Sequence, residues 1–254
     1  MRGAVKVYGV VASPFVATVL LCLEETGVGY ELVPVDMAAR EQKTEPYLCR
    51  NVSFQSSSTI QMRQLLFPAI RQAQLYAPFG KIPTFDDGEI TLFESRAISR
   101  YILRKYGPAG TPKDLLRESN LEESAMVDAW TEVEAHQYHP AISNIVRQCV
   151  IMPLIGGARD QAVVDENVGK LGKVLDVYEA RLSSSPYLAG DFFSLADLAH
   201  FAFTYFLMAG TEYTPLLEKR ASVGAWWGRS MARPAVRKVA ALIDVGLLKQ
   251  MSSS

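Results

Sequence analysis

The stretch VKVYGVVASPFVATVLLCLEETGVGYELVPV (residues 5–35) has the pattern of a strand, a helix and a second strand. Ser13 followed by Pro14 is a helix-start signal, because a capping side chain stands before proline at the first helical position. The apolar residues that follow recur at helical spacing on one face, namely Val16, Val19, Leu20 and Leu23. Gly27 and Gly29 are expected to end that helix. Residues 30–35 have the pattern of the second strand. Two strands joined by a helix predict a parallel pair with a right-handed crossover.

A hairpin and another helix start follow further along the chain. Two short apolar runs, 82–85 and 90–93, flank the turn sequence Asp86-Asp87-Gly88. A glycine turn between two such runs predicts an antiparallel pair of strands. Glu94-Ser95 then opens a helix. The order βαβ followed by ββα is typical of a thioredoxin-like domain.

The rest of the chain has a helical pattern throughout. Glycine and proline punctuate residues 106–112, so we place a linker at 105–118, between a first domain at 1–104 and an all-helical domain at 119–254. Residues 195–208 are apolar nearly all round, which indicates a central buried helix. The capping-box pattern Ser194-Leu-Ala-Asp197 precedes that helix, and we assign it to stability rather than catalysis. The predicted fold class is α+β with two domains.

Composition excludes several classes of function. The 254 residues contain 26 basic and 27 acidic side chains, a net charge of −1, so nothing favours nucleic acid as a partner. The three cysteines, Cys22, Cys49 and Cys149, are odd in number and widely spaced. We expect free thiols in a reducing compartment, no metal site and a cytoplasmic protein.

Residues 10–23 form an apolar run that resembles the core of a signal peptide. The run is too short to span a bilayer as a helix. Pro14 interrupts it, and two glutamates follow it instead of a cleavage pattern. We therefore expect a strand end and a buried helix here, and no membrane association.

Residues 49–77 do not fit the pattern of the first domain. They form a long connection between the second strand and the hairpin, with an unusual insertion at about 52–77. Three interpretations stay open: a poorly packed excursion with one short helix, a functional lid, and a remnant of unspliced intervening sequence.

Several motifs together make the chain resemble the phi class of plant glutathione transferases. They are VYGVVAS at 7–13, EQK at 41–43, PFGKIP at 78–83, LFESRAISRYI at 92–102, KVLDVYEARL at 173–182 and YLAGDFFSLADL at 187–198. The similarity covers nearly the whole chain except the insertion. It implies a thioredoxin-like domain followed by a helical domain, usually in a homodimer, and glutathione as co-substrate without a further cofactor.

The resemblance implies that Ser13 is the catalytic residue, because the catalytic serine of the class aligns here. A free thiol has a pKa of about 8.5, so little of the reactive thiolate exists at neutral pH. A hydroxyl that donates to the sulfur, together with a helix N-terminus, favours the thiolate. The sequence pattern alone favours a simple helix cap at Ser13, and it is the resemblance that favours the catalytic role.

The resemblance also implies a glutathione site. Glu94 and Ser95 would hold the γ-glutamyl end, and Ile82 before a cis Pro83 would pair its backbone with the cysteinyl unit. Gln42, Lys43 and Lys81 would meet the glycyl carboxylate. Family members often have histidine in place of Gln42 and glutamine in place of Lys81, so we expect a changed affinity for glutathione rather than lost activity.

The second substrate is expected to be hydrophobic. The resemblance places Phe15, Met37, Tyr138 and Ile142 around it, although core packing explains each of these side chains equally well. Phe79 corresponds to an aromatic plug that family dimers insert into the neighbouring subunit.

The leading hypothesis is conjugation of glutathione to hydrophobic electrophiles, with glutathione-dependent reduction of organic hydroperoxides as a further activity. The alternative is a non-catalytic carrier of hydrophobic small molecules, whose glutathione site the 52–77 insertion impairs. A weaker alternative, based on the apolar run near the N-terminus, is a secreted or anchored protein.

Overall fold

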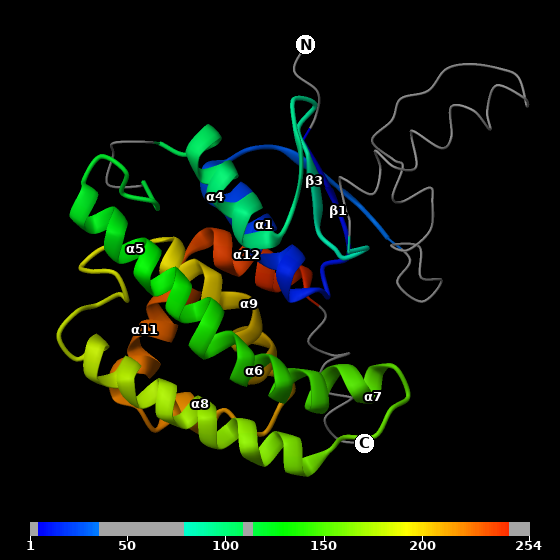
Figure 1. Ribbon diagram of the computed structural model, residues 1–254, viewed down its shortest axis with the longest axis vertical. Helices are drawn as coiled ribbons and strands as arrows, with labels where there is room; N and C mark the ends of the chain where they lie inside the picture. The colour runs from blue at the N-terminus through cyan, green and yellow to red at the C-terminus, as the bar shows by residue number, and fades with distance from the viewer. Residues whose placement is uncertain (1–4, 36–78, 109–113, 244–254) are drawn as a thin grey trace, which may run out of the picture.

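The computed structural model describes residues 5–35, 79–108 and 114–243 (Figure 1). Within these ranges the first domain contains a four-stranded sheet of order β2-β1-β3-β4. Its elements are β1(Val5–Tyr8), α1(Pro14–Thr26), β2(Tyr30–Val33), β3(Thr84–Asp86), β4(Thr91–Phe93) and α4(Ser95–Tyr106). β1 pairs with β2 in parallel and with β3 antiparallel, and β3 pairs with β4 antiparallel. The predicted thioredoxin-like arrangement is confirmed.

The local signals of α1 act as predicted. Ser13 has extended backbone angles, Pro14 occupies the first turn, and Gly27 ends the helix in the left-handed conformation with a φ of 70°. That conformation favours glycine, because in other residues the Cβ atom comes too close to the following backbone carbonyl oxygen. The residues from Val16 to Leu23 are all buried, because α1 packs against α4 of its own domain and against α9 and α12 of the second. The helix that begins at Ser13 thus forms part of both domains.

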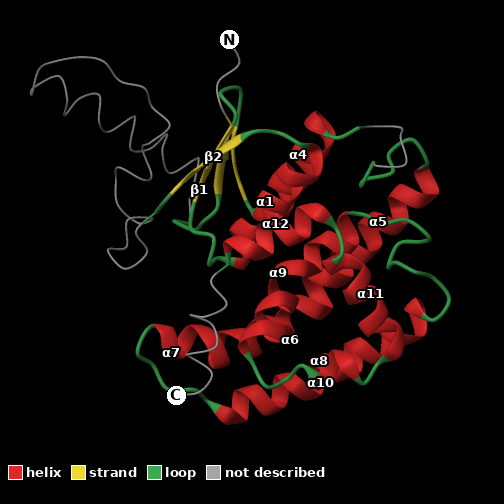
Figure 2. Cartoon of the chain, turned by 180° about the vertical axis from the view of Figure 1, so that it is seen from behind, coloured by secondary structure: helices red, strands yellow, loops and turns green. Residues whose placement is uncertain are grey.

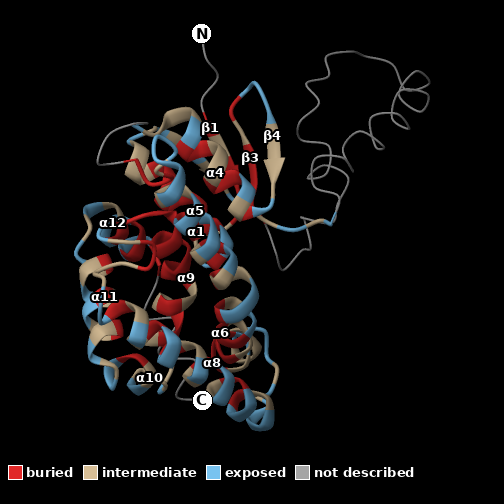
Figure 3. Ribbon diagram, turned by 60° about the vertical axis from the view of Figure 1, so that its left-hand side comes forward, coloured by how far each residue is buried: buried red, intermediate tan, exposed pale blue. Residues whose placement is uncertain are grey.

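The second domain is helical in its described residues, as Figure 2 shows. Its elements are α5(Leu121–Val133), η2(Glu134–Tyr138), α6(His139–Val146), η3(Arg147–Ile151), α7(Met152–Leu154), α8(Gln161–Leu182), α9(Leu195–Gly210), α10(Pro215–Glu218), α11(Ala221–Met231) and α12(Pro234–Leu242). Buried residues concentrate on α9 at the centre of this domain (Figure 3). The prediction of a central buried helix is therefore confirmed.

Asp197 stabilises the start of α9. The carboxylate accepts hydrogen bonds from the backbone N–H of Ser194 at 3.0 Å, the N–H of Leu188 at 2.9 Å and the indole Nε1–H of Trp226 at 2.8 Å. A buried carboxylate needs such donors because it has lost its water. The capping box thus joins α9 to the preceding loop and to α11, in agreement with the structural role predicted for it.

The helix from α5 to α7 contains two π-helical turns, η2 and η3, that the sequence analysis did not predict. Pro140 follows the end of η2 by two residues, and Pro153 follows the end of η3 by the same spacing. Proline lacks an N–H and crowds the carbonyl four residues before it, so the helix widens ahead of each proline. These turns change which face of the helix the following side chains occupy.

Ion pairs and a shared core join the two domains. Arg233 at the start of α12 donates from Nε and Nη2 to the two carboxylate oxygens of Glu25 on α1, at 2.7 Å each. Lys238 on α12 donates to Glu24 at 2.7 Å. Cys22 and Cys149 are buried free thiols, as predicted, whereas Cys49 lies outside the described residues.

Candidate active site

The register of the sheet brings three chain segments to one edge. Tyr8 at the end of β1 faces Thr84 at the start of β3, and Thr84 faces Phe93 at the end of β4. The loop that leads to Ser13, the segment that precedes β3 and the start of α4 therefore meet at the same end of the sheet. Helix N-termini and loops at such an edge form a usual place for a ligand.

A cleft of about 180 Å³ lies at this edge. The described residues that line it are Phe15, Phe79, Lys81, Ile82, Pro83, Phe93, Glu94 and Ser95. The structure thus brings together five of the predicted glutathione-binding residues and one residue of the predicted hydrophobic pocket. The peptide bond between Ile82 and Pro83 is cis, as the resemblance implied.

Ser13 stands at the N-terminus of α1, two residues before Phe15. Its backbone N–H donates to the carbonyl of Val10 at 2.9 Å, and its carbonyl accepts from the N–H of Ala17 at 3.0 Å. The Ser13 side chain makes no capping hydrogen bond to the helix. The purely structural explanation of Ser13 as a side-chain cap therefore lacks its hydrogen bond, and the hydroxyl is available to another acceptor near the positive end of the helix dipole.

The start of α4 has a strained backbone at Glu94, the residue that precedes Ser95. Glu94 has a φ of 69° and a ψ of 105°, which a residue with a side chain adopts only at a cost of about 1–3 kcal/mol. Ser95 is buried, and its carbonyl accepts a hydrogen bond from the Ser99 hydroxyl at 2.8 Å. Strain of this kind persists where the surroundings fix the backbone, and it clusters at ligand sites.

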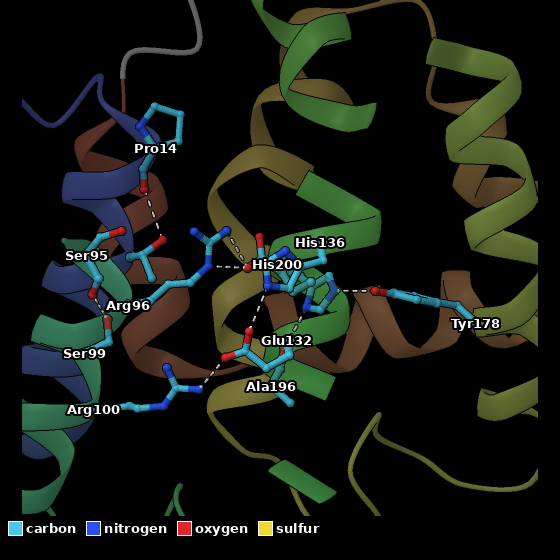
Figure 4. A network of polar contacts seen from close by, with 12 residues as sticks. Pro14, Ser95, Arg96, Ser99, Arg100, Glu132, His136, Tyr178, Ala196 and His200 are labelled. Atoms are coloured by element: carbon cyan, nitrogen blue, oxygen red, sulfur yellow. Dashed lines mark hydrogen bonds and ion pairs between the residues drawn. The ribbon is translucent and has the colours of Figure 1, made fainter. Parts of the chain in front are cut away.

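Arg96 connects this part of α4 to the second domain. Its Nε donates to the Glu134 carboxylate at 2.8 Å, and its Nη2 lies 2.7 Å from the same oxygen. The Glu134 side chain is 3 % exposed, and burial raises the pKa of its carboxyl while Arg96 opposes that rise. In Figure 4, Arg96 and Arg100 both reach from α4 toward the second domain, where Arg100 meets Glu132. The Arg96–Glu134 pair could not be predicted from the sequence pattern, because its members lie on different domains.

The remaining predicted site residues fall elsewhere. Met37, Gln42 and Lys43 lie outside the described residues. Tyr138 and Ile142 are fully buried, and the Tyr138 hydroxyl is paired with Thr204 Oγ1 at 2.7 Å. The Tyr138 ring also stacks on Tyr178. For these two side chains the structure favours core packing over ligand contact, which corrects their assignment to the hydrophobic pocket.

His139 and Phe203 lie beside Phe15 in the structure, and neither was predicted to be a site residue. The His139 ring centroid lies 5.5 Å from that of Phe15 and 4.6 Å from that of Phe203. Phe15 and Phe203 also meet edge to face at 5.4 Å. The three rings come from α1, α6 and α9, so helical spacing within one element could not reveal them.

Neither a metal site nor a membrane span is found among the described residues. No group of three or more His, Cys, Asp or Glu side chains there is arranged to hold a metal ion. None of the helices described is long and apolar enough to cross a membrane.

Comparison with known proteins agrees with this architecture over nearly the whole chain. Family models of the glutathione S-transferase N-terminal and C-terminal domains match residues 7–112 and 138–234. The probable glutathione S-transferase GSTF1 of Oryza sativa is 52% identical over 240 residues, which cover 94% of this chain and 96% of that protein. Glutathione S-transferase 4 of Zea mays is 49% identical and covers 96% of this chain, with 95% of its own length matched.

Solved structures show the same relationship. Glutathione transferase F7 of Populus trichocarpa superimposes with a TM-score of 0.80 at 45% identity, covering 95% of this chain and 100% of that one. Maize glutathione S-transferase I in complex with an atrazine–glutathione conjugate gives a TM-score of 0.78 at 46% identity, covering 94% and 98% of the two chains. The chain is therefore an enzyme that belongs to the glutathione S-transferase family, and its relatives are the plant phi-class enzymes.

Proposed function

We propose that Ser13 activates glutathione in this enzyme by donating a hydrogen bond from its hydroxyl to the sulfur, so that the thiolate attacks hydrophobic electrophiles. The observation that carries the proposal is the Ser13 hydroxyl at the start of α1, which makes no side-chain capping bond. A base-assisted serine nucleophile is disfavoured, because among the described residues no hydrogen bond joins Ser13 to His136, His139 or His200.

The energy required is within reach of this arrangement. Lowering the thiol pKa from about 8.5 by about two units needs ~2.7 kcal/mol of preferential thiolate stabilisation. A hydrogen bond to a charged group contributes about 1.5–3 kcal/mol, and a helix N-terminus adds about 0.3–1 kcal/mol. One hydroxyl and one helix end together suffice.

The cleft suggests how glutathione lies. Glu94 would receive the ammonium of the γ-glutamyl unit, and Ser95 with the first N–H groups of α4 would hold its carboxylate. Ile82, before Pro83, would pair its backbone with the cysteinyl unit. Lys81 would meet the glycyl carboxylate together with Gln42 and Lys43, and Phe15 with Met37 would contact the electrophile.

We further propose that the enzyme is a cytoplasmic homodimer with domains at residues 1–104 and 119–254. The exposure of Phe79 supports the proposed dimer, because its side chain is 66% exposed and its ring packs against Phe93 at the rim of the cleft. An exposed aromatic side chain on an aromatic platform suits insertion into a neighbouring subunit. Sedimentation equilibrium of wild type and Phe79→Ala would test this assembly.

The Ser13→Ala variant tests the catalytic proposal. We expect kcat/KM with 1-chloro-2,4-dinitrobenzene to fall by about 10²-fold, because the loss of one hydrogen bond to a negatively charged reacting atom typically has an effect of this size. Ultraviolet difference titration of bound glutathione should show its thiol pKa returning toward about 8.5. Ser183→Ala, at an exposed helix end on α8, is the matched control and should leave both values unchanged.

Two results would contradict the proposal. An unaltered thiol pKa in Ser13→Ala would remove the role of the hydroxyl. If wild type and Ser13→Ala were equally inert but still bound a hydrophobic dye, the result would favour a non-catalytic carrier of hydrophobic small molecules.

An assay with cumene hydroperoxide as substrate would measure whether the same thiolate also supports peroxide reduction.

A further inference from the structure

His139 has an unusual environment at the junction of the two domains. Its ring lies between Phe15 and Phe203, at centroid distances of 5.5 and 4.6 Å. Phe15 is 37% exposed and lines the cleft, and His139 itself is only partly buried. A polar ring thus packs against Phe15, an aromatic side chain that lines the cleft of the proposed glutathione site.

The Nδ1 atom of His139 is buried and has no hydrogen-bond partner among the described residues. The same holds for Nε of Arg159 and Nε of Arg229, but each of these arginines bonds through another nitrogen. No hydrogen bond of the His139 side chain is found in the described part of the chain. Buried polar groups are almost always paired, so an unpaired one calls for a functional explanation.

His200 provides a contrast within the same domain. Its Nε2 pairs with the Tyr178 hydroxyl at 2.8 Å, as Figure 4 shows, and its Nδ1 pairs with the carbonyl of Ala196 at 2.6 Å. Both ring nitrogens of this core histidine are therefore satisfied, as expected for a structural role. His139 does not follow that pattern, although both ring nitrogens of His200 find hydrogen-bond partners in the same domain.

The helix places His139 through the π turn that precedes it. Its N–H closes the wide turn on the carbonyl of Glu134, and Pro140 follows directly. The turn leaves Tyr138 in the core and His139 against Phe15. π turns of this kind often occur at functional sites.

The imidazole is neutral at physiological pH. Burial lowers the pKa of His139 to about 4, and the charge of Arg96 acts in the same direction. A neutral imidazole carries one N–H, and an unpaired buried N–H is less well tolerated than an unpaired acceptor. The proton therefore favours Nε2 over the buried Nδ1.

We propose that His139 is a specificity-determining residue of the electrophile pocket, whose Nε2–H donates a hydrogen bond to an oxygen acceptor, such as a nitro or carbonyl group, on an aromatic electrophile. This inference rests on the proposed conjugation function and names its substrate class. Phe15 and Phe203 hold the aromatic part, and the histidine selects substrates that carry the acceptor. A site that pairs a polar group discriminates against analogues that lack it.

The test compares two electrophiles that differ in the acceptor. With 1-chloro-2,4-dinitrobenzene, which carries nitro oxygens, His139→Leu is expected to lower kcat/KM about tenfold, the range of one net hydrogen bond. With benzyl chloride, which has no oxygen, kcat/KM should stay within about twofold. His139→Gln restores a neutral donor and should recover most of the ratio between the two substrates.

His136→Leu is the matched control, because His136 lies on the same helix with a side chain that is 72% exposed. It should leave the substrate ratio unchanged. Equal losses on both substrates in His139→Leu, or no recovery in His139→Gln, would overturn the inference while leaving conjugation intact. A wild-type enzyme inert toward both electrophiles would instead overturn the proposed function, and this inference with it.

Discussion

Asp87 shows how a single buried carboxylate can stabilise the first domain. Its side chain is fully buried in the β3–β4 turn and accepts hydrogen bonds from Tyr101 and Tyr106 at 2.8 and 2.9 Å and from Lys105 at 2.6 Å. The backbone N–H groups of Glu89 and Ile90 donate to its other oxygen. Burial alone would raise the pKa of Asp87, but these donors hold it well below the usual range.

Asp87→Asn should therefore lower the free energy of unfolding by about 2–4 kcal/mol at pH 7. A depressed carboxyl pKa stabilises the fold above the unfolded value near 3.8, and this contribution falls as the pH drops below it. Urea unfolding at pH 7 and pH 3 should show a smaller difference from wild type at pH 3. Glu89→Gln removes an exposed partner of the same lysine and should cost under about 1 kcal/mol. Equal losses of unfolding free energy in Asp87→Asn and Glu89→Gln would contradict the stabilising role assigned to the buried carboxylate.

At the scale of elements, local signals in the sequence were sufficient for α1 and for the hairpin. Ser13, Pro14 and Gly27 mark the ends of α1 by their own backbone preferences, so no distant contact was needed to predict them. The assignment of Tyr138 and Ile142 to the pocket came from the resemblance alone, and in this chain both side chains are fully buried in the core, with Tyr138 at the end of the π turn. The Phe15–His139–Phe203 group could not be predicted, since only tertiary packing of three helices brings it together.

The first turns of α4 offer a test of how the second domain positions the cleft. Arg96→Met leaves Glu134, 3 % exposed, without its charged partner, and should cost about 3 kcal/mol of unfolding free energy. It should also raise the KM for glutathione severalfold, because Glu94 and Ser95 precede Arg96 on the same turn. Removing the arginine raises the pKa of Glu134 further above its ordinary value. Because a buried carboxyl with a raised pKa costs more stability as the pH rises, the loss of unfolding free energy in Arg96→Met should grow from pH 5 to pH 8.

Arg100→Met is the control on the same helix. Its partners Asp128 and Glu132 are exposed and lie 3.4 Å away, so we expect a cost of about 1 kcal/mol or less and an unchanged KM. Steady-state kinetics and urea unfolding of the two variants give the comparison. A KM for glutathione that rises equally in both would rule out a specific role for the Arg96–Glu134 pair.

At the scale of the whole molecule, α1 makes the two domains depend on each other. Its buried residues contribute to a core that continues into α9 and α12, and Arg233 holds Glu25 by two hydrogen bonds while its guanidinium lies 3.9 Å from the Phe193 ring centroid. Because the two domains share one core, we expect them to unfold as a single cooperative unit. The Ser13 hydroxyl at the start of α1, for which we propose the catalytic role, therefore depends on contacts that α1 makes with α12.

Arg233→Leu should weaken this coupling. All three tryptophans, Trp130, Trp226 and Trp227, belong to the helical domain, so their fluorescence reports its unfolding, whereas conjugation activity reports the cleft. In wild type the two signals should be lost at the same urea concentration. In Arg233→Leu the activity should be lost first, with a decrease of about 2–3 kcal/mol in unfolding free energy, because Glu25 stays mostly buried without its partner.

Lys238→Ala is the control, because it removes an exposed cation that pairs with Glu24. Its fluorescence and activity transitions should stay together. Coincident transitions in Arg233→Leu would show that the apolar contacts of α1 alone couple the two domains.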